Sequence, residues 1–118
     1  MADDAPVLVL IAADPRATHR ANEGMRIGLG IVAGENEVTF VLRGPAVHLL
    51  DEDTDDLVDG DDIAKFRANL KRLEIAFHVE AADVPGEAGW NAEGHPVRSV
   101  SRAEVIALIR ASRRVLVF

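Results

Sequence analysis

Short, continuous apolar stretches recur along the chain and predict a buried parallel sheet. The first is Val7–Ala13 (VLVLIAA), which is rich in β-branched residues and is followed by Asp14 and Pro15. An unbroken apolar run of this length is typical of a strand covered on both faces, and the proline ends it because it has no backbone N–H to donate. Four more strands are expected at Glu37–Leu42, Ile75–Val79, Val97–Val100 and Val115–Phe118.

Helical periodicity separates most of the predicted strands. In three segments the apolar side chains recur at helical spacing, so that one stripe of each would face the sheet. These helices are expected over about Ala17–Ala33, from a cap at Asp61 or Asp62 to about Leu73, and from the capping box at Ser101 to about Ser112. Between them, Ala46–Leu50 is predicted to form a short helical turn, and the Gly- and Pro-rich segment 81–96 to be irregular.

The alternation of strands and helices predicts the fold class. Strands joined through helices form right-handed crossovers and one parallel sheet with helices on both faces. We therefore expect an α/β fold, a three-layer α/β/α arrangement with about five parallel strands, flavodoxin-like in outline. With 118 residues the chain has room for one hydrophobic core, so residues 1–118 are expected to form a single domain.

Composition excludes several kinds of chemistry. The chain has no cysteine, which removes disulfides, thiolate nucleophiles and Cys-ligated metal sites. The net charge is −7, the basic residues are scattered and there is no tyrosine, so no nucleic-acid partner is expected. The first residues are acidic where a secretory signal is basic, and no apolar stretch approaches the roughly 20 residues of a membrane span. We expect a soluble, cytoplasmic protein without a membrane partner and without a cofactor.

Four segments together are similar to a known family. They are VLVLIAADP with the helix ANEGMRIGLGIVAG, the strand and turn EVTFVLRGPAVHLL, the strand and loop IAFHVEAADVPGEAG, and the ending SVSRAEVIALIRASRRVLVF. Over nearly its whole length the chain resembles the DsrE/DsrF/TusD (DsrEFH-like) sulfur-relay family. The resemblance implies a DsrEFH-like fold and a homo-oligomer, a trimer or a hexamer.

The chain lacks the cysteine that carries sulfur in active members of this family. In active members a cysteine at the end of the third strand carries persulfide sulfur. The matching position here is Glu80, with His78 as the alternative, and neither side chain can form a persulfide. The chain is therefore expected to be a noncatalytic oligomeric or small-ligand-binding protein related to sulfur-relay subunits.

An acid–base enzyme is the first alternative function. Parallel α/β sheets bind ligands beyond the carboxyl ends of their strands, which brings forward the loops after Ala13, Leu42 and Val79. Glu80 together with His78 or His19 would place a carboxylate and an imidazole there. The competing structural interpretation is that His78 forms a hydrogen bond within a half-buried strand and Glu80 is a solvated strand end.

Three further residues are candidates for ligand binding. Arg20 and Arg43 are positioned to receive an anion near the same edge, or are ordinary surface residues. Trp90 lies in the Gly- and Pro-rich segment, where it would cover a pocket, anchor a subunit interface or pack onto its own domain. The ligand-binding candidates are thus His19, Arg20, Arg43, His78, Glu80 and Trp90.

The acidic segment 51–62 suggests a third function, binding of calcium or of a partner. It contains eight carboxylates and no Lys or Arg, and Asp51, Asp53 and Asp55 have the spacing of the first EF-hand ligands. However, Asp56 replaces the glycine of the sharp turn, and Asp62 replaces the bidentate glutamate. We therefore expect no metal site, and a solvated loop that caps the next helix.

Overall fold

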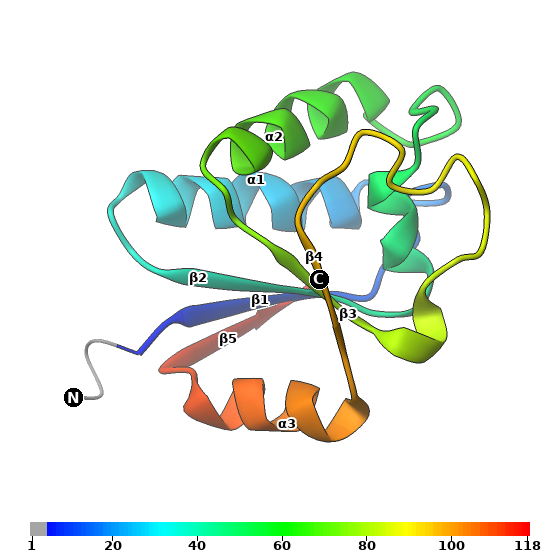
Figure 1. Cartoon of the computed structure of the whole chain (residues 1–118). Helices are drawn as coiled ribbons and strands as arrows, with labels where there is room; N and C mark the ends of the chain where they lie inside the picture. Colours follow the sequence, from blue (N-terminus) through cyan, green and yellow to red (C-terminus); the bar gives the residue numbers. More distant parts are fainter. Residues whose placement is uncertain (1–4) are drawn as a thin grey trace.

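Each of the five apolar runs forms a strand, and the strands make one parallel sheet. The computed structural model describes residues 5–118. Its strands are β1 (Val7–Ile11), β2 (Val38–Leu42), β3 (Phe77–Glu80), β4 (Val97–Val100) and β5 (Arg114–Val117). They lie in the order β4-β3-β2-β1-β5, and every neighbouring pair is parallel (Figure 1). The predicted sheet is confirmed.

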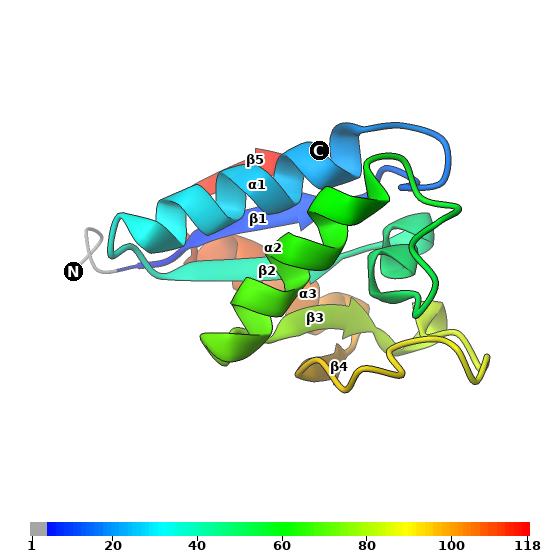
Figure 2. The same cartoon turned by 90° about the horizontal axis from the view of Figure 1, so that it is seen from above.

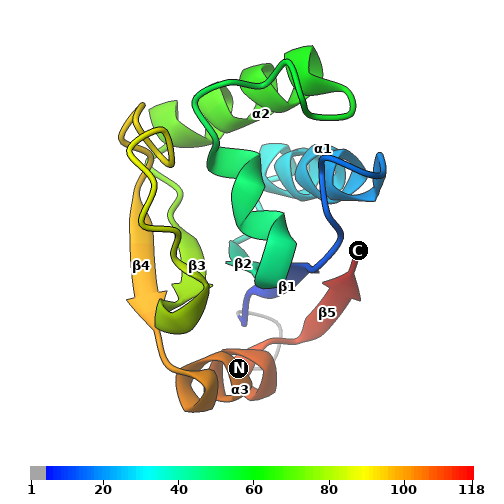
Figure 3. The ribbon, with the colours of Figure 1, turned by 90° about the vertical axis from the view of Figure 1, so that its right-hand side faces the viewer.

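Helices cover both faces of the sheet, but unequally. The helices α1 (Arg20–Ala33) and α2 (Gly60–Arg72) and the 3-10 helix η2 (Gly44–Leu50) lie on one face, and α3 (Arg102–Ala111) covers the other (Figures 1 and 3). The chain steps from β1 through β2 to β3 in one direction and returns from β4 to β5 in the opposite direction. Right-handed crossovers therefore place α1 and α2 on one face and α3 on the other. This is the expected three-layer α/β/α arrangement.

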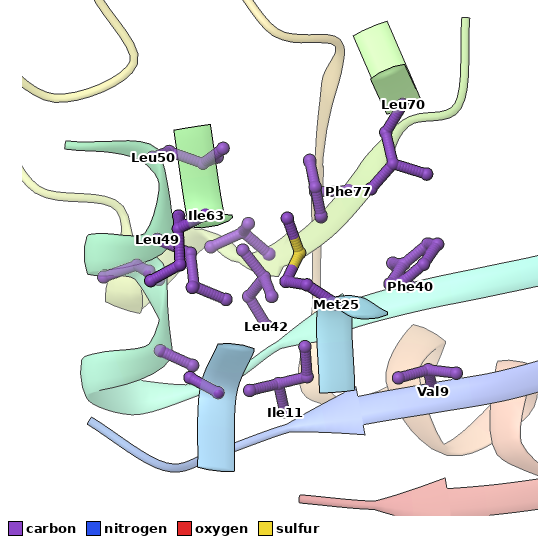
Figure 4. Close-up of a cluster of buried hydrophobic side chains, with 14 of the residues drawn as sticks. Val9, Ile11, Met25, Phe40, Leu42, Leu49, Leu50, Ile63, Leu70 and Phe77 are labelled. Atoms are coloured by element: carbon purple, nitrogen blue, oxygen red, sulfur yellow. The ribbon is translucent and has the colours of Figure 1, made fainter. Parts of the chain in front are cut away.

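The larger core lies between the sheet and the pair of helices α1 and α2, which run side by side in Figure 2. Its strand residues alternate with those facing α3, as the two-residue repeat of a strand requires. Figure 4 shows side chains of this larger core: Met25, Ile63 and Leu70 of the helices point toward Phe40 and Phe77 of the sheet. The smaller core joins Leu8, Leu10 and Val41 of the strands to Val105 of α3.

The two-residue repeat also orients the candidate residues of β3. Phe77 and Val79 belong to the core under α1 and α2. His78 and Glu80 alternate with them along β3 and therefore point to the α3 face. Within residues 5–118, α3 is the one α-helix on that face, and these two side chains are only partly buried.

The starts of two helices differ from the prediction. The helix α1 begins at Arg20 instead of Ala17, because Asp14 first makes a turn in which its carbonyl accepts the N–H groups of Ala17 and Thr18. The helix α2 begins at Gly60 after Asp59, which has left-handed backbone angles and no capping hydrogen bond. The expected cap at Asp61 or Asp62 is therefore wrong. Gly60 is packed against the backbone of Thr54, and a β-carbon would lie 2.0 Å from its carbonyl oxygen.

The predicted capping box is present. The hydroxyl of Ser101 accepts the backbone N–H of Glu104, and the Glu104 carboxylate accepts the backbone N–H of Ser101. Within residues 5–118, no helix has both the length and the apolar character needed to cross a bilayer.

Candidate functional site

A pocket lies where the ends of β1, β2 and β3 meet the start of α3. It has a volume of about 370 Å³, and we call it the carboxyl-edge pocket. Parallel strands all end at the same edge of a sheet, so residues distant in sequence meet there. It is lined by Ala12, Arg43, Gly44, Pro45, Glu80, Asp83 and Arg102. Two of the six candidate residues from the sequence, Arg43 and Glu80, are therefore brought together.

Glu80 and Arg43 form a loose ion pair in this pocket. Glu80 is the last residue of β3, and Arg43 follows β2 directly, with its backbone N–H donating to the carbonyl of Ile11 at 2.9 Å. The Nη2 atom of Arg43 lies 3.6 Å from Oε1 of Glu80, which is longer than a hydrogen bond. Oε1 of Glu80 and Nε of Arg43 are both buried without a hydrogen-bond partner. Unpaired buried polar atoms are unfavourable, so a bound group or water that pairs with them would be stabilised here.

Asp83 and Arg102 add one charge of each sign to the pocket. Asp83 ends the short 3-10 helix η3 (Ala81–Asp83), and its Oδ2 accepts the backbone N–H of Gly44 at 3.0 Å. This hydrogen bond ties the exit of β3 to the exit of β2 and leaves the second carboxylate oxygen for a ligand. Arg102 is the first residue of α3 and is exposed. The pocket thus contains two guanidinium groups and two carboxylates.

Asp83 and Arg102 are not among the candidate residues predicted from the sequence. Arg102 is the second residue after β4, so the rule that ligands bind beyond strand ends would have indicated it if applied to the fourth strand. Asp83 lies in a segment expected to be irregular. Nothing in that segment's composition shows that it folds back to the exit of β2.

His78 is on the same face as Glu80 but lines other hollows. Its Nδ1 lies 3.1 Å from the carbonyl oxygen of Phe40 and donates a hydrogen bond to it, because a carbonyl can only accept. Together with Arg98 it borders a groove of about 560 Å³ between β4 and α3, lined also by Val100 and Leu108. The structural interpretation, a hydrogen bond within a half-buried strand, describes His78 well.

His19 and Arg20 lie on the opposite side of the sheet. His19 precedes α1 and Arg20 is its first residue, whereas His78 and Glu80 face α3. Both His19 and Arg20 are exposed. The structure therefore does not bring His19, His78 and Glu80 into one cleft, because the sheet separates the first from the other two.

Trp90 packs onto its own domain. Its Nε1 donates to the carbonyl of Val47 in η2 at 2.8 Å, and its ring packs against the core under α1 and α2. A backbone bridge between Trp90 and Asp51 joins the same two segments. Of the three roles left open for Trp90, packing within the domain is the one its contacts show.

A buried cation, Arg67, holds the segment 81–96 against α2. No pattern in the sequence predicts this cluster of Arg67, Glu93 and His95. Arg67 of α2 is 1% exposed and donates to the carbonyls of Leu49 at 3.0 Å and Asp51 at 2.6 Å, and to the carboxylate of Glu93 at 2.7 Å. His95 lies beside it, 4% exposed, with no hydrogen bond to either ring nitrogen. Burial and the nearby charge of Arg67 lower the pKa of His95. The cluster fixes the fold of this segment and lies away from the carboxyl-edge pocket.

The acidic segment 51–62 does not assemble a calcium site. Among the described residues 5–118, no group of three or more His, Asp or Glu side chains is placed to hold a metal ion. Asp53 instead accepts the backbone N–H of Asp55 at 2.9 Å, which shapes the loop locally. The calcium alternative therefore receives no support from the geometry.

Comparison with known proteins gives a likeness of fold. No protein-family model matches the sequence, and no curated protein matches it in a sequence search. Among solved structures, the chain is similar to the ychN protein from E. coli, with a TM-score of 0.73 and 12% sequence identity over 97% of this chain and 99% of that one. At this identity the likeness concerns the fold alone. The chain thus has the α/β fold with a five-stranded parallel sheet that the sequence predicts, and it shares this fold with the ychN protein.

Proposed function

We propose that the protein is a noncatalytic small-ligand-binding relative of the sulfur-relay subunits, and that the carboxyl-edge pocket holds the ligand. One observation carries the proposal. A pocket with four charged side chains lies at the sheet edge where parallel α/β proteins bind ligands, and two buried polar atoms in it have no partner.

The residues around the pocket support binding more than reaction. The chain has no cysteine, and Glu80, or alternatively His78, stands where the resemblance places the sulfur carrier. The nearby hydroxyl of Ser101 caps α3 and accepts the N–H of Glu104. His78 lines other hollows and His19 lies across the sheet, so neither of these two imidazoles joins Glu80 for proton transfer.

We propose further that the protein forms a homo-oligomer, a trimer or a hexamer, through the α3 side of the sheet. Val117 on β5 is 62% exposed and Ile106 on α3 is 44% exposed. Val117 lies two residues after Val115 in β5, so both side chains point to the same face of the sheet. Val115 packs in the smaller core, and Val117 therefore points to the α3 face. A contact between subunits would bury exposed apolar side chains such as these on the α3 face of the sheet. The cytoplasmic location expected from the sequence stays a prediction.

The ligand-binding proposal is tested by NMR with 15N-labelled protein. Mixtures of small carboxylates, amines, zwitterions and neutral polar compounds are titrated in turn. We expect at least one class to shift the amide signals of Gly44, Glu80 and Asp83 together. In Glu80→Gln, which keeps the side chain's size but removes its charge, binding of that class should be about tenfold weaker. His19→Gln, on the opposite face, is the matched control and should bind as the unmodified protein does. If no class moves these signals, the proposal is wrong.

A further inference from the structure

We infer that the ligand of the carboxyl-edge pocket is a small zwitterion, a molecule with one carboxylate and one ammonium group, of the size of an α-amino acid. The inference rests on the proposed function and names the class of ligand. It follows from the charges that line the pocket, from their existing partners and from the pocket's size.

The charges of the pocket are balanced. Arg43 and Arg102 supply two positive charges, and Glu80 and Asp83 supply two negative ones. Binding partners are selected by complementary charge, and an unmatched charge buried by a ligand is costly. A ligand with one charge of each sign is complementary to such a lining, whereas a ligand of one sign meets repulsion from half of it.

The existing contacts show which groups remain for a ligand. Arg43 and Glu80 face one another at 3.6 Å. Arg102 has no ion pair within residues 5–118, and Asp83 has one oxygen occupied by the N–H of Gly44. The guanidinium of Arg102 is suited to a carboxylate, because its planar fork can donate two parallel hydrogen bonds. Asp83 and Glu80 are suited to an ammonium group, whose three N–H groups need acceptors.

Other classes of ligand fit less well. Phosphate or sulfate would bring two negative charges against Glu80 and Asp83, and a diamine would meet both arginines. An apolar molecule would cover four charged groups without pairing them, which is unfavourable. The volume of about 370 Å³ is at the small end of the range of about 300–1,000 Å³ for ligand pockets, which suits a small ligand.

The test compares three forms of one compound by NMR titration. L-Alanine carries both charges, N-acetyl-L-alanine keeps the carboxylate alone, and L-alaninamide keeps the ammonium alone. Inorganic phosphate serves as the purely anionic probe. The amide signal of Gly44 is the readout, because its N–H donates to Asp83 inside the pocket. We expect L-alanine to shift this signal, and each blocked form to bind about tenfold more weakly.

Two variants separate the two ends of the ligand. Arg102→Gln should weaken L-alanine and N-acetyl-L-alanine about tenfold, and Asp83→Asn should weaken L-alanine and L-alaninamide by a similar factor. Arg110→Gln is the matched control, because Arg110 is an exposed arginine in the last turn of the same helix. Circular dichroism and the melting temperature verify that each variant is folded.

The outcomes separate the two proposals. If a blocked form or phosphate binds as tightly as L-alanine, the zwitterion is the wrong class while ligand binding at the pocket stands. If Arg110→Gln weakens L-alanine as much as Arg102→Gln does, the assignment of the carboxylate to Arg102 is overturned. If none of the four probes, nor any class in the broader titration, shifts the Gly44 signal, both proposals fail.

Discussion

At the scale of single residues, the pocket is lined by charges that are partly exposed, whereas the segment 81–96 is held by a buried one. Glu80 and Arg43 are kept apart at 3.6 Å, with one buried atom of each unpaired. Arg67, in contrast, is 1% exposed and donates to the carbonyls of Leu49 and Asp51 and to the carboxylate of Glu93. These acceptors of Arg67 fix the local structure although its Nε has no partner, whereas Arg43 and Glu80 line a pocket in which a ligand can add contacts.

His95 should make stability depend on pH. Its pKa is lowered from 6.5, chiefly by burial and also by the positive charge of Arg67, with Lys71 adding to the effect and Glu93 opposing it. As the pH falls below about 6.5, the unfolded chain binds a proton at this position that the folded chain does not bind. The free energy of unfolding should therefore decrease between pH 6.5 and the lower pKa of the folded state.

Urea unfolding measured at several pH values checks this prediction. His95→Gln should show a flatter pH dependence in that window, because the titrating group is gone. The carboxyls of Asp14 and Glu23, whose pKa values are lowered by hydrogen bonds from Arg16 and Arg26, act at lower pH, below about 4.5. An equally steep dependence in His95→Gln would contradict the assignment to His95.

At the scale of elements, the position of α1 depends on two glycines that face the sheet. A β-carbon on Gly28 would lie 2.4 Å from the ring of Phe40, and one on Gly24 would lie 2.8 Å from Ile11. The helix can approach β1 and β2 this closely only because these two residues have no side chain. The same helix carries a third glycine, Gly30, whose surroundings are empty within 4 Å.

Two glycine substitutions in α1 should have opposite effects. Gly28→Ala should destabilise the protein by about 1–3 kcal/mol, because the added methyl group overlaps the ring of Phe40. Gly30→Ala, the matched control, should stabilise it by about 0.5–1 kcal/mol. Alanine has less backbone freedom than glycine in the unfolded chain, and at this position its methyl group meets no other atom. Denaturant melts of the two variants give both values. A stabilising Gly28→Ala would show that α1 can move away from the sheet at little cost.

At the scale of the whole molecule, the two faces of the sheet are unequally covered. The helices α1 and α2 and the segment η2 pack over one face, while α3 covers the other (Figure 3). The side of the sheet near β3 and β4 is consequently left as a groove beside α3. This asymmetry also leaves Val117 and Ile106 exposed, and the proposed oligomer contact follows from it.

A charged substitution at Val117 should dissociate the proposed oligomer. Val117→Lys places a charge in the proposed contact on the α3 face. The mass of this variant in solution should therefore fall to that of one chain, 12.7 kDa. The control is Leu73→Lys, because Leu73 is 48% exposed but follows α2, on the other side of the sheet. Light scattering after size-exclusion chromatography measures both. A monomeric unmodified protein would overturn the proposal of a homo-oligomer.

The sequence by itself determined the elements and their alternation. Continuous apolar runs such as Val7–Ile11 can be stable only between two covered faces, and the box at Ser101 and Glu104 satisfies the first N–H groups of α3 through neighbours in the chain. These preferences are local, so they can be recognised without coordinates. They also placed Arg43 and Glu80 at strand ends, and the parallel sheet brings those ends to one edge.

Only the tertiary structure decided which candidates meet. The face to which His78 and Glu80 point depends on the register of β3 against β2, and the side on which His19 lies depends on the direction of the crossover from β1 to β2. Asp83 joins the pocket through a hydrogen bond to Gly44, 39 positions away in the chain. Such contacts depend on how the chain returns on itself, because long-range packing and charge pairing leave no periodic signature in the residues that form them.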